Sequence, residues 1–469
     1  MSLLEKVYDP ENFRQTAHHL ADMLADNLTA NLNRETIKVI NFIDPDTNYN
    51  NWKDKEFGSP EAFFREVINN SIQLQHPRYV GHQVSAPAPI AALAAFEGMM
   101  LNSGGAIYEM SAASTTLEKV VIDRLKGYFG FSDGDGIVTS GGTLANLTAL
   151  ICARNVKASN DIWNEGQKEK YAFMVSEEAH YCIDRAVRVM GWGDAGVIKI
   201  PVDSKYRMKT ECLETYRKEA ASRGVKVIGV VGSAPTTSTG IYDDLNAIGR
   251  YCQKHNLWYH IDAAHGGPVV FSEKYKDLML GCDLADSITV DAHKMMMTPS
   301  LTTMLFFKNS NDSYRTFAQK AQYLWGDADQ EWFNYGKRTM ECTKIMLSTR
   351  IYALIITYGI EVFGEYVDRC FDMGGIFAKL ITQRPGMELA VQPDSNIVCF
   401  RIVHADIPIA NEINRKIRQA ILEDGTFYIV QTVLQDKVHL RVSIMNPFTS
   451  ESDLIDLLDL IEQLQNSLE

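Results

Sequence analysis

The chain has 469 residues, of which 46% are hydrophobic and 22% are charged, and its formal net charge is −13. This is the composition of a globular protein of two or three structural units, and its acidic balance argues against a nucleic-acid partner, which requires a basic surface. No run of about 18 uninterrupted apolar residues occurs, so neither a membrane-spanning helix nor a membrane partner is expected.

The first part of the chain predicts helices. Apolar residues recur at helical spacing within residues 10–40, residues 41–60 are rich in Asn, Asp and Pro as in a loop, and residues 61–74 predict a second helix. We therefore expect residues 1–75 to form a helical arm, too thin for a core of its own, that packs on a neighbour or a second subunit. The N-terminus contains acidic residues and no long apolar stretch, so no signal peptide is expected.

Residues 76–347 alternate predicted strands with predicted helices. One helix includes Leu144–Ile151, and another includes Leu245–Cys252 with Asp243 as its N-cap. Such alternation predicts a mainly parallel sheet covered by helices. Seven strands are predicted, at Ile137–Thr139, Ala172–Val175, Val197–Ile200, Val225–Val231, Leu257–Ile261, Ser287–Val290 and Thr303–Phe307.

The pattern changes after residue 347, where helices and strands no longer alternate regularly. The predicted order is a helix at Thr349–Phe363, a strand at Ile397–Ile402, a helix at Ala410–Leu422, strands at Phe427–Val433 and Val438–Ile444, and a helix at Glu451–Gln465. Residues 348–469 are therefore expected to form a small C-terminal α+β domain. The whole chain is predicted to be an α/β protein with a helical arm at 1–75 and a large domain at 76–347.

Two of the predicted strands end in residues that can carry chemistry. Asp262 follows one strand, and Asp291-Ala292-His293-Lys294 follows another. Ligands of open α/β sheets bind at the carboxyl ends of the strands, and pyridoxal phosphate (PLP) requires a carboxylate for its ring nitrogen and a lysine for its aldehyde. Alone, such a Lys is more often a surface charge, and such an Asp is often a turn or cap residue.

A glycine-rich turn supports the interpretation of Asp262 and Lys294 as residues that bind PLP. Ser140-Gly141-Gly142-Thr143 follows a predicted strand and opens a predicted helix. Glycines allow the backbone to approach a phosphate, and a helix N-terminus offers free N–H groups to it. By itself, the turn is equally compatible with an ordinary strand-to-helix connection.

Four segments together resemble one family. TSGGTLANLTAL, SEEAHYCIDRA, HIDAAHGG and DSITVDAHK, in this order and spacing, are similar to the group II PLP-dependent amino-acid decarboxylases, and the match extends from about Gln75 to the C-terminus. The resemblance implies a fold type I PLP-dependent transferase-like structure, PLP as the cofactor, and a homodimer with active sites at the interface. It is much less specific for the substrate, because the family includes glutamate, cysteine-sulfinate, aromatic amino-acid and 2,4-diaminobutyrate decarboxylases.

The resemblance assigns a role to each matching residue. It implies that Lys294 binds the cofactor covalently and that Asp262 keeps its pyridine nitrogen protonated. The other matches are Gly142, Thr143 and His293 at the phosphate, His180 and Ala264 on the two ring faces, Thr237 near the phenolic oxygen, Gly336 at the other subunit's phosphate, and Arg441 at the substrate α-carboxylate. Pro235 stands where the family generally has glycine, and proline lacks an N–H donor and fixes φ, so the loop near Thr237 departs from the pattern.

The resemblance leaves two assignments open, the proton donor and the substrate. Tyr323 and Tyr335 are the candidates for the family's loop tyrosine, and Tyr335 joins Lys294, His180 and Asp262 as an expected catalytic residue. The Tyr108-Glu109 segment is similar to glutamate and cysteine-sulfinate decarboxylases, whereas His82 resembles diaminobutyrate decarboxylases.

A small acidic substrate is favoured, with Arg78 as the second cation that its side chain needs. Alternatives are a diaminobutyrate or aromatic amino-acid decarboxylase, a PLP-dependent aldehyde synthase, an aminotransferase, a carbon–carbon lyase, or a non-catalytic PLP-binding homologue.

The eight cysteines are scattered, and none forms a CxxC pair. This spacing predicts no metal site and no redox motif. Reduced, packing cysteines are typical of a cytoplasmic protein, which is the expected location.

Overall fold

The structure is a computed structural model of the chain that describes residues 2–317 and 331–468. It divides into two compact units. Unit 1 comprises Met1–His82, Met373–Ala390 and Val398–Glu469, and unit 2 comprises Gln83–Asp372 and Val391–Ile397. The N-terminal helices thus share a unit with most of the C-terminal residues. Within the described ranges, no helix combines the length and apolarity needed to cross a membrane.

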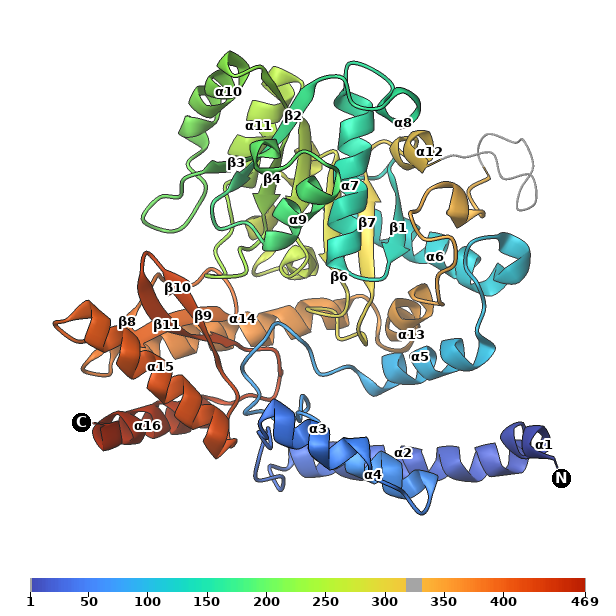
Figure 1. Cartoon of the computed structure of the whole chain (residues 1–469), viewed down its shortest axis with the longest axis vertical. Helices are drawn as coiled ribbons and strands as arrows, with labels where there is room; N and C mark the ends of the chain where they lie inside the picture. Colours follow the sequence, from blue (N-terminus) through green and yellow to red (C-terminus); the bar gives the residue numbers. More distant parts are fainter. Residues whose placement is uncertain (1, 318–330, 469) are drawn as a thin grey trace. The chain divides into compact units, whose positions relative to one another are not determined.

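Unit 2 contains a seven-stranded sheet in the order β1-β7-β6-β5-β4-β2-β3 (Figure 1). Six of the seven strands run in one direction, and β7 runs antiparallel to both of its neighbours. The predicted mainly parallel sheet is confirmed, as is each of its strands. Their bounds are β1 Asp135–Thr139, β2 Lys170–Ser176, β3 Val197–Ile200, β4 Val225–Ser233, β5 Trp258–Asp262, β6 Ser287–Asp291 and β7 Thr303–Phe307.

Helices cover this sheet, and α7 packs across β4, β5, β6 and β7 (Figure 1). The α-helices that lie in unit 2 or begin there are α5 Pro89–Leu101, α6 Ala112–Leu125, α7 Gly142–Lys157, α8 Ile162–Glu165, α9 Tyr181–Val189, α10 Leu213–Ser222, α11 Leu245–His255, α12 Asp312–Phe317, α13 Ser348–Tyr358 and α14 Glu361–Thr382. Its 3₁₀ helices are η1 Tyr108–Met110, η2 Lys126–Phe129, η3 Asp194–Gly196, η4 Thr210–Cys212, η5 Gly267–Phe271, η6 Lys276–Met279, η7 Cys282–Leu284 and η8 Tyr335–Lys337.

Two helix boundaries differ from the predictions. The N-cap of α11 is Asp244, whose side chain accepts the N–H of Ala247. The buried carboxylate of Asp243 instead accepts the N–H groups of Met208 and Ser233, so its role as N-cap was wrong. The single helix predicted over 349–363 is divided at Gly359, where φ is +79°.

Unit 1 combines a four-stranded sheet with helices. The strand order is β10-β11-β9-β8, and one apolar core joins sheet residues such as Phe400 and Leu440 to helix residues such as Phe377 and Ile461. The strands are β8 Met387–Leu389, β9 Ile397–Ile402, β10 Val430–Leu434 and β11 Lys437–Ser443. The α-helices confined to this unit are α1 Leu3–Val7, α2 Pro10–Leu32, α3 Pro45–Lys53, α4 Pro60–Asn70, α15 Ile407–Asp424 and α16 Glu451–Leu468.

Three N-terminal helices begin in the same way. Asp9-Pro10, Asp44-Pro45 and Ser59-Pro60 each place a capping side chain before a proline at the first helical position. The cap accepts a free N–H of the first turn, and proline has no N–H to satisfy there. The loop predicted over residues 41–60 was therefore wrong for α3, because Asp44-Pro45 starts a helix rather than interrupting one.

Candidate active site

The carboxyl ends of β1, β4, β5 and β6 meet at a cavity of about 260 Å³ in unit 2. Eight of the nine residues predicted to bind the cofactor line it, and they come from separate parts of the sequence. They are Gly142, Thr143, His180, Thr237, Asp262, Ala264, His293 and Lys294. The structure therefore brings together side chains that the sequence linked only through motifs.

The glycine turn forms one wall of the cavity. Gly141 is the N-cap of α7 and has φ +122°, a conformation that residues other than glycine rarely adopt. A Cβ on Gly142 would lie 2.9 Å from Asp291 Oδ1, so no side chain fits there. The first N–H groups of a helix lack intrahelical acceptors. The turn therefore offers backbone donors in a space shaped for a phosphate.

Lys294 is paired with a buried carboxylate. Its Nζ lies 3.0 Å from Asp291 Oδ2, His293 Nε2 lies 3.6 Å from the same oxygen, and Thr303 Oγ1 donates to Asp291 Oδ1 at 2.5 Å. Burial would raise the pKa of Asp291, but its interactions with Lys294, His293 and Thr303 outweigh burial and lower it. Burial would likewise lower the pKa of Lys294, but Asp291 and Asp262 raise it. Lys294 is thus an ammonium in the free protein.

Asp262 ends β5 with both carboxylate oxygens engaged. Its Oδ1 accepts the N–H of Ala264 at 3.3 Å, and its Oδ2 accepts Asn146 Nδ2–H at 3.0 Å. Because each carboxylate oxygen can accept more than one hydrogen bond, Asp262 keeps acceptor capacity for a group in the cavity that it lines. A protonated ring nitrogen is such a group.

His180 lines the cavity as a neutral ring. It caps α9, and its Nδ1 accepts the N–H of Cys182 at 3.3 Å. Burial lowers its pKa, although Asp262 opposes the effect. With Nδ1 accepting, the neutral ring carries its proton on Nε2. A flat neutral imidazole suits the predicted stacking on the cofactor ring.

One group of side chains in the cavity has the spacing of metal ligands. Donor atoms of His180, Cys182 and Asp262 all lie within 4.8 Å of one another. Burial, followed by the charge of Asp262, raises the pKa of the Cys182 thiol to about 12. Because the thiolate is the form that binds metals, the protonated Cys182 weighs against a metal here.

Thr237 lines the cavity together with Pro235. Thr236 N–H donates to the Ile241 carbonyl at 2.9 Å, and the hydroxyls of Thr236 and Thr239 lie 2.7 Å apart. These bonds close the loop on itself. The proline that departs from the family pattern is thus accommodated with Thr237 still at the cavity.

Two of the lining residues carry chemistry that the sequence analysis missed. Asn146 lies four residues after Gly142 on α7, so the two share one face of the helix. Asp291 ends β6 as Asp262 ends β5. Helical spacing from the glycine turn would have identified the first, and comparison of the two strand ends would have identified the second.

Tyr335 and Gly336 are not among the residues that line the cavity. Tyr335 is fully buried with the Lys344 ammonium 4.4 Å from its ring centroid, and burial raises its pKa well above the ordinary value. Gly336 N–H donates to the Ala106 carbonyl at 2.9 Å. Such burial weighs against Tyr335 as a proton donor. Tyr323, the other candidate, lies outside the described residues.

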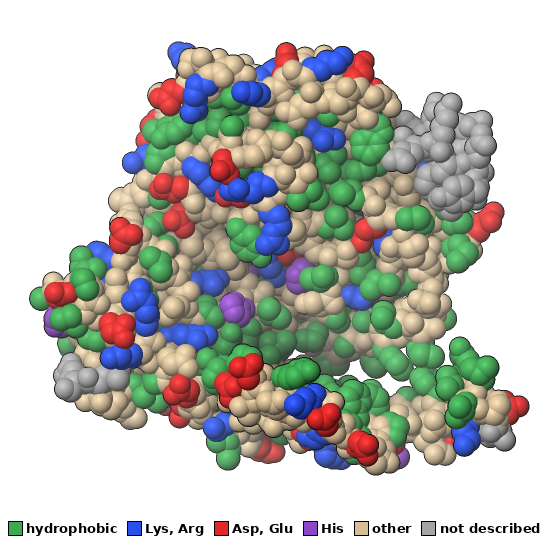
Figure 2. Space-filling model, viewed as in Figure 1, with side chains coloured by type: hydrophobic (Ala, Val, Ile, Leu, Met, Phe, Trp, Pro, Cys, Tyr) green, Lys and Arg blue, Asp and Glu red, His purple; other side chains and the backbone are tan. Residues whose placement is uncertain are grey.

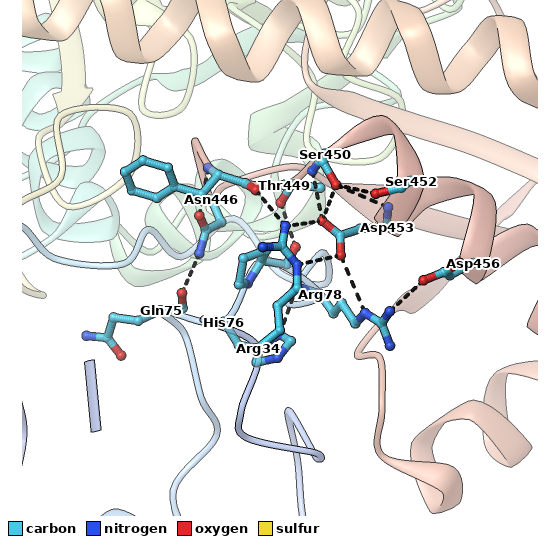
Figure 3. Close-up of polar contacts among 12 residues, drawn as sticks. Arg34, Gln75, His76, Arg78, Asn446, Thr449, Ser450, Ser452, Asp453 and Asp456 are labelled. Carbon is cyan, nitrogen blue, oxygen red and sulfur yellow. Dashed lines mark hydrogen bonds and ion pairs between the residues drawn. The ribbon is translucent and has the colours of Figure 1, made fainter. Parts of the chain in front are cut away.

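The three predicted substrate-binding residues belong to unit 1. Arg78 donates to Asp456 at 2.5 Å and lies 3.5 Å from Asp453 (Figure 3), so its charge is already paired within this unit. Burial, and then the charge of Arg441, lowers the pKa of His82, which leaves that ring neutral. Arg441 is buried in β11, and burial lowers its pKa.

Comparisons with known proteins identify the family of the chain. A family model described as the pyridoxal-dependent decarboxylase conserved domain matches residues 63–403. The chain is 26% identical to the aromatic-L-amino-acid decarboxylase of Bacillus atrophaeus, over 97% of this chain and 95% of that protein. It is 29% identical to the L-aspartate decarboxylase dtxS4 of Metarhizium robertsii, over 72% and 68% of the two chains. The crystal structure of mouse CSAD shares the fold, with a TM-score of 0.90 at 24% identity, and the match covers 97% of this chain and 99% of that one.

Proposed function

The chain belongs to the pyridoxal-dependent decarboxylase family and is a PLP-dependent amino-acid decarboxylase, and we propose that the cavity of unit 2 is its active site. One observation carries the assignment. Asp262 ends β5, Lys294 follows the neighbouring parallel strand β6, and both line a single cavity together with the glycine turn. When bound, PLP accepts the electron pair released as the substrate carboxylate leaves as CO₂.

We propose that different residues around the cavity bind different parts of the cofactor. Backbone N–H groups at Gly142 and Thr143 bind the phosphate, and His293 adds a side-chain donor. Asp262 holds a proton on the ring nitrogen, His180 covers one ring face, and Lys294 binds the aldehyde carbon. Arg441 is assigned to the substrate α-carboxylate, a role that rests on the sequence motif.

A small acidic amino acid is the proposed substrate. The resemblance of the Tyr108-Glu109 segment supports it, as does the 29% identity to a protein named for L-aspartate decarboxylation. A histidine carries no negative charge in either protonation state, so His82 alone offers no counter-charge to a basic diamino acid. Because Arg78 is engaged by two carboxylates, the proposal does not assign it as the second cation.

An aromatic substrate is the second candidate, because the match to an aromatic-L-amino-acid decarboxylase covers nearly the whole of both chains. A CO₂-release screen of the PLP-loaded protein decides between the two. Aspartate, glutamate and cysteine sulfinate should react well, and aromatic amino acids and 2,4-diaminobutyrate poorly, because a site built to pair an acidic side chain gains nothing from a neutral one and repels a basic one. The reverse order would overturn the acidic assignment. Formation of aldehyde and ammonia instead of an amine would indicate an aldehyde synthase.

We further propose that the active protein is a homodimer. Hydrophobic side chains gather on the surface along α5 (Figure 2), where Leu93, Met99, Met100 and Leu101 are each more than half exposed. Contiguous exposed apolar patches of this kind mark interaction surfaces. In this dimer, Gly336 is assigned to the phosphate site of the other subunit, as the family pattern implies.

A further inference from the structure

A chain of hydrogen bonds leads from Asp262 into the interior of unit 2. Asp262 Oδ2 accepts Asn146 Nδ2–H at 3.0 Å, and Asn146 Oδ1 lies 2.9 Å from His260 Nε2. His260 Nδ1 lies 2.8 Å from Ser287 Oγ, which accepts Trp258 Nε1–H at 3.0 Å. We infer that Asn146, His260, Ser287 and Trp258 form a one-way relay of hydrogen bonds that orients the Asp262 carboxylate. The inference rests on the proposed role of Asp262 at the cofactor ring nitrogen.

The direction of each bond follows from chemistry. A carboxylate only accepts, so the amide nitrogen of Asn146 faces Asp262 and its carbonyl oxygen faces His260. His260 Nε2 must then carry the proton, which leaves Nδ1 of the neutral ring to accept from the Ser287 hydroxyl. The indole N–H of Trp258 only donates, and it ends the relay at Ser287.

The four residues of the relay are buried from solvent. Trp258 and Asn146 are each 1% exposed, and His260 and Ser287 are each 0% exposed. Burial lowers the pKa of His260 to about 4, against the opposing charge of Asp262 and a hydrogen bond to the Ser287 backbone. A protonated His260 would also carry a hydrogen on Nδ1 and could no longer accept from Ser287. Geometry and burial therefore agree on a neutral ring.

A neutral relay has a consequence for Asp262. Asn146 donates a charge-assisted hydrogen bond to the carboxylate, yet the relay adds no positive charge that would cancel the attraction of Asp262 for a protonated ring nitrogen. Since the members belong to α7, β5 and β6, the relay also fixes the carboxylate against three elements at once. The relay residues are positioning residues, because they act through Asp262.

Two measurements test the relay. In the cofactor-free protein, ¹⁵N NMR of labelled histidine should show His260 as the Nε2–H tautomer across neutral pH. In the PLP-loaded protein, the ¹⁵N signal of labelled cofactor reports whether the ring nitrogen is protonated. Asn146→Leu and His260→Leu should each shift the ratio of protonated to unprotonated nitrogen by at least about tenfold towards unprotonated, which is about one pKa unit.

Conservative and control variants separate positioning from packing. His260→Gln retains an amide donor towards Asn146 and should recover most of the ring-nitrogen signal. Thr289→Val is the matched control, because Thr289 is fully buried on β6 and, within the described residues, its hydroxyl has no hydrogen-bond partner. It should leave both signals unchanged.

Three results would overturn the inference. They are a His260 that titrates near pH 6.5 or carries its proton on Nδ1, an unchanged ring-nitrogen signal in both leucine variants, or an equal shift in Thr289→Val. If the leucine variants fail to fold, the histidine tautomer of the unmodified protein still decides. That measurement uses no cofactor and no substrate, so its result stands apart from any failure of the proposed function.

Discussion

At the residue scale, Asp291 gives Lys294 a buried partner that the cofactor must displace. The pair is 3.0 Å apart and the carboxylate is almost fully buried. A lysine reacts with an aldehyde only as the neutral amine, whereas Asp291 favours the ammonium. The lysine would therefore have to give up a proton before it could attack the aldehyde of the cofactor.

Removing the charge of Asp291 should make capture easier at lower pH. Asp291 raises the pKa of Lys294 against burial, so in Asp291→Asn that pKa falls and more of the lysine is neutral at any given pH. The pH profile of borohydride-reducible PLP incorporation should move down by at least about one unit. A profile that stays in place or moves to higher pH would show that Asp291 does not control the lysine.

At the element scale, the contact between the glycine turn and β6 sets the shape of the phosphate site. Gly142→Ala would place a Cβ 2.9 Å from a buried carboxylate oxygen and force the turn away from its position. The Kd for PLP should rise about tenfold or more, about 1.4 kcal/mol. Fluorescence titration measures it. Gly127→Ala, where a Cβ meets nothing within 4 Å, is the control. Equal affinities of the two variants would refute a tight turn.

A second element-scale prediction concerns acid stability in unit 1. Asp453, on α16, accepts from Arg34 at 2.7 Å and from Ser450 at 2.6 Å (Figure 3). Burial would raise the pKa of Asp453, but these partners outweigh burial and lower it to about 2. A depressed pKa contributes stability that is complete above about pH 4 and is lost as the pH falls towards 2.

Asp453→Asn should therefore cost about 2 kcal/mol at pH 7, and its deficit should narrow by about 1 kcal/mol between pH 5 and pH 3. Denaturant unfolding at each pH measures both values. Asp456→Asn is the control, because the Asp456 side chain is 50% exposed, and surface pairs contribute under about 1 kcal/mol. A deficit that is independent of pH would show that ionisation of Asp453 does not stabilise unit 1.

The helices and strands also show which parts of the fold could be predicted from the sequence. The seven strands of unit 2 were predictable because each is a short run rich in apolar and β-branched residues between turn residues. The three-residue β8 was missed, since Met387–Leu389 is too short to show a period. Eight cavity residues followed from motifs, whereas the contacts of Asn146 with Asp262 and His260 span 116 and 114 positions and appear only in the folded chain. Arg78 and Asp453 are 375 positions apart, and no local pattern reveals that pairing.

At the scale of the whole molecule, the central expectation is assembly. Sedimentation should show a dimer, and Met100→Glu on α5 should weaken it, because the substitution would bury a charge at an apolar interface. Leu280→Glu is the control, since Leu280 is 69% exposed and lies outside α5. Deletion of residues 1–60 should impair folding or dimerisation together with activity. A fully active monomer would refute the dimer.

The most direct test of the whole account is the identity of the lysine that holds PLP. The loaded protein should be yellow, and borohydride reduction followed by peptide mapping should place the cofactor on Lys294. Lys294→Ala should lose the reducible link while still retaining some PLP through the glycine turn and Asp262. Fixation to a different lysine, or an unchanged link in Lys294→Ala, would contradict the assignment of this cavity as the active site.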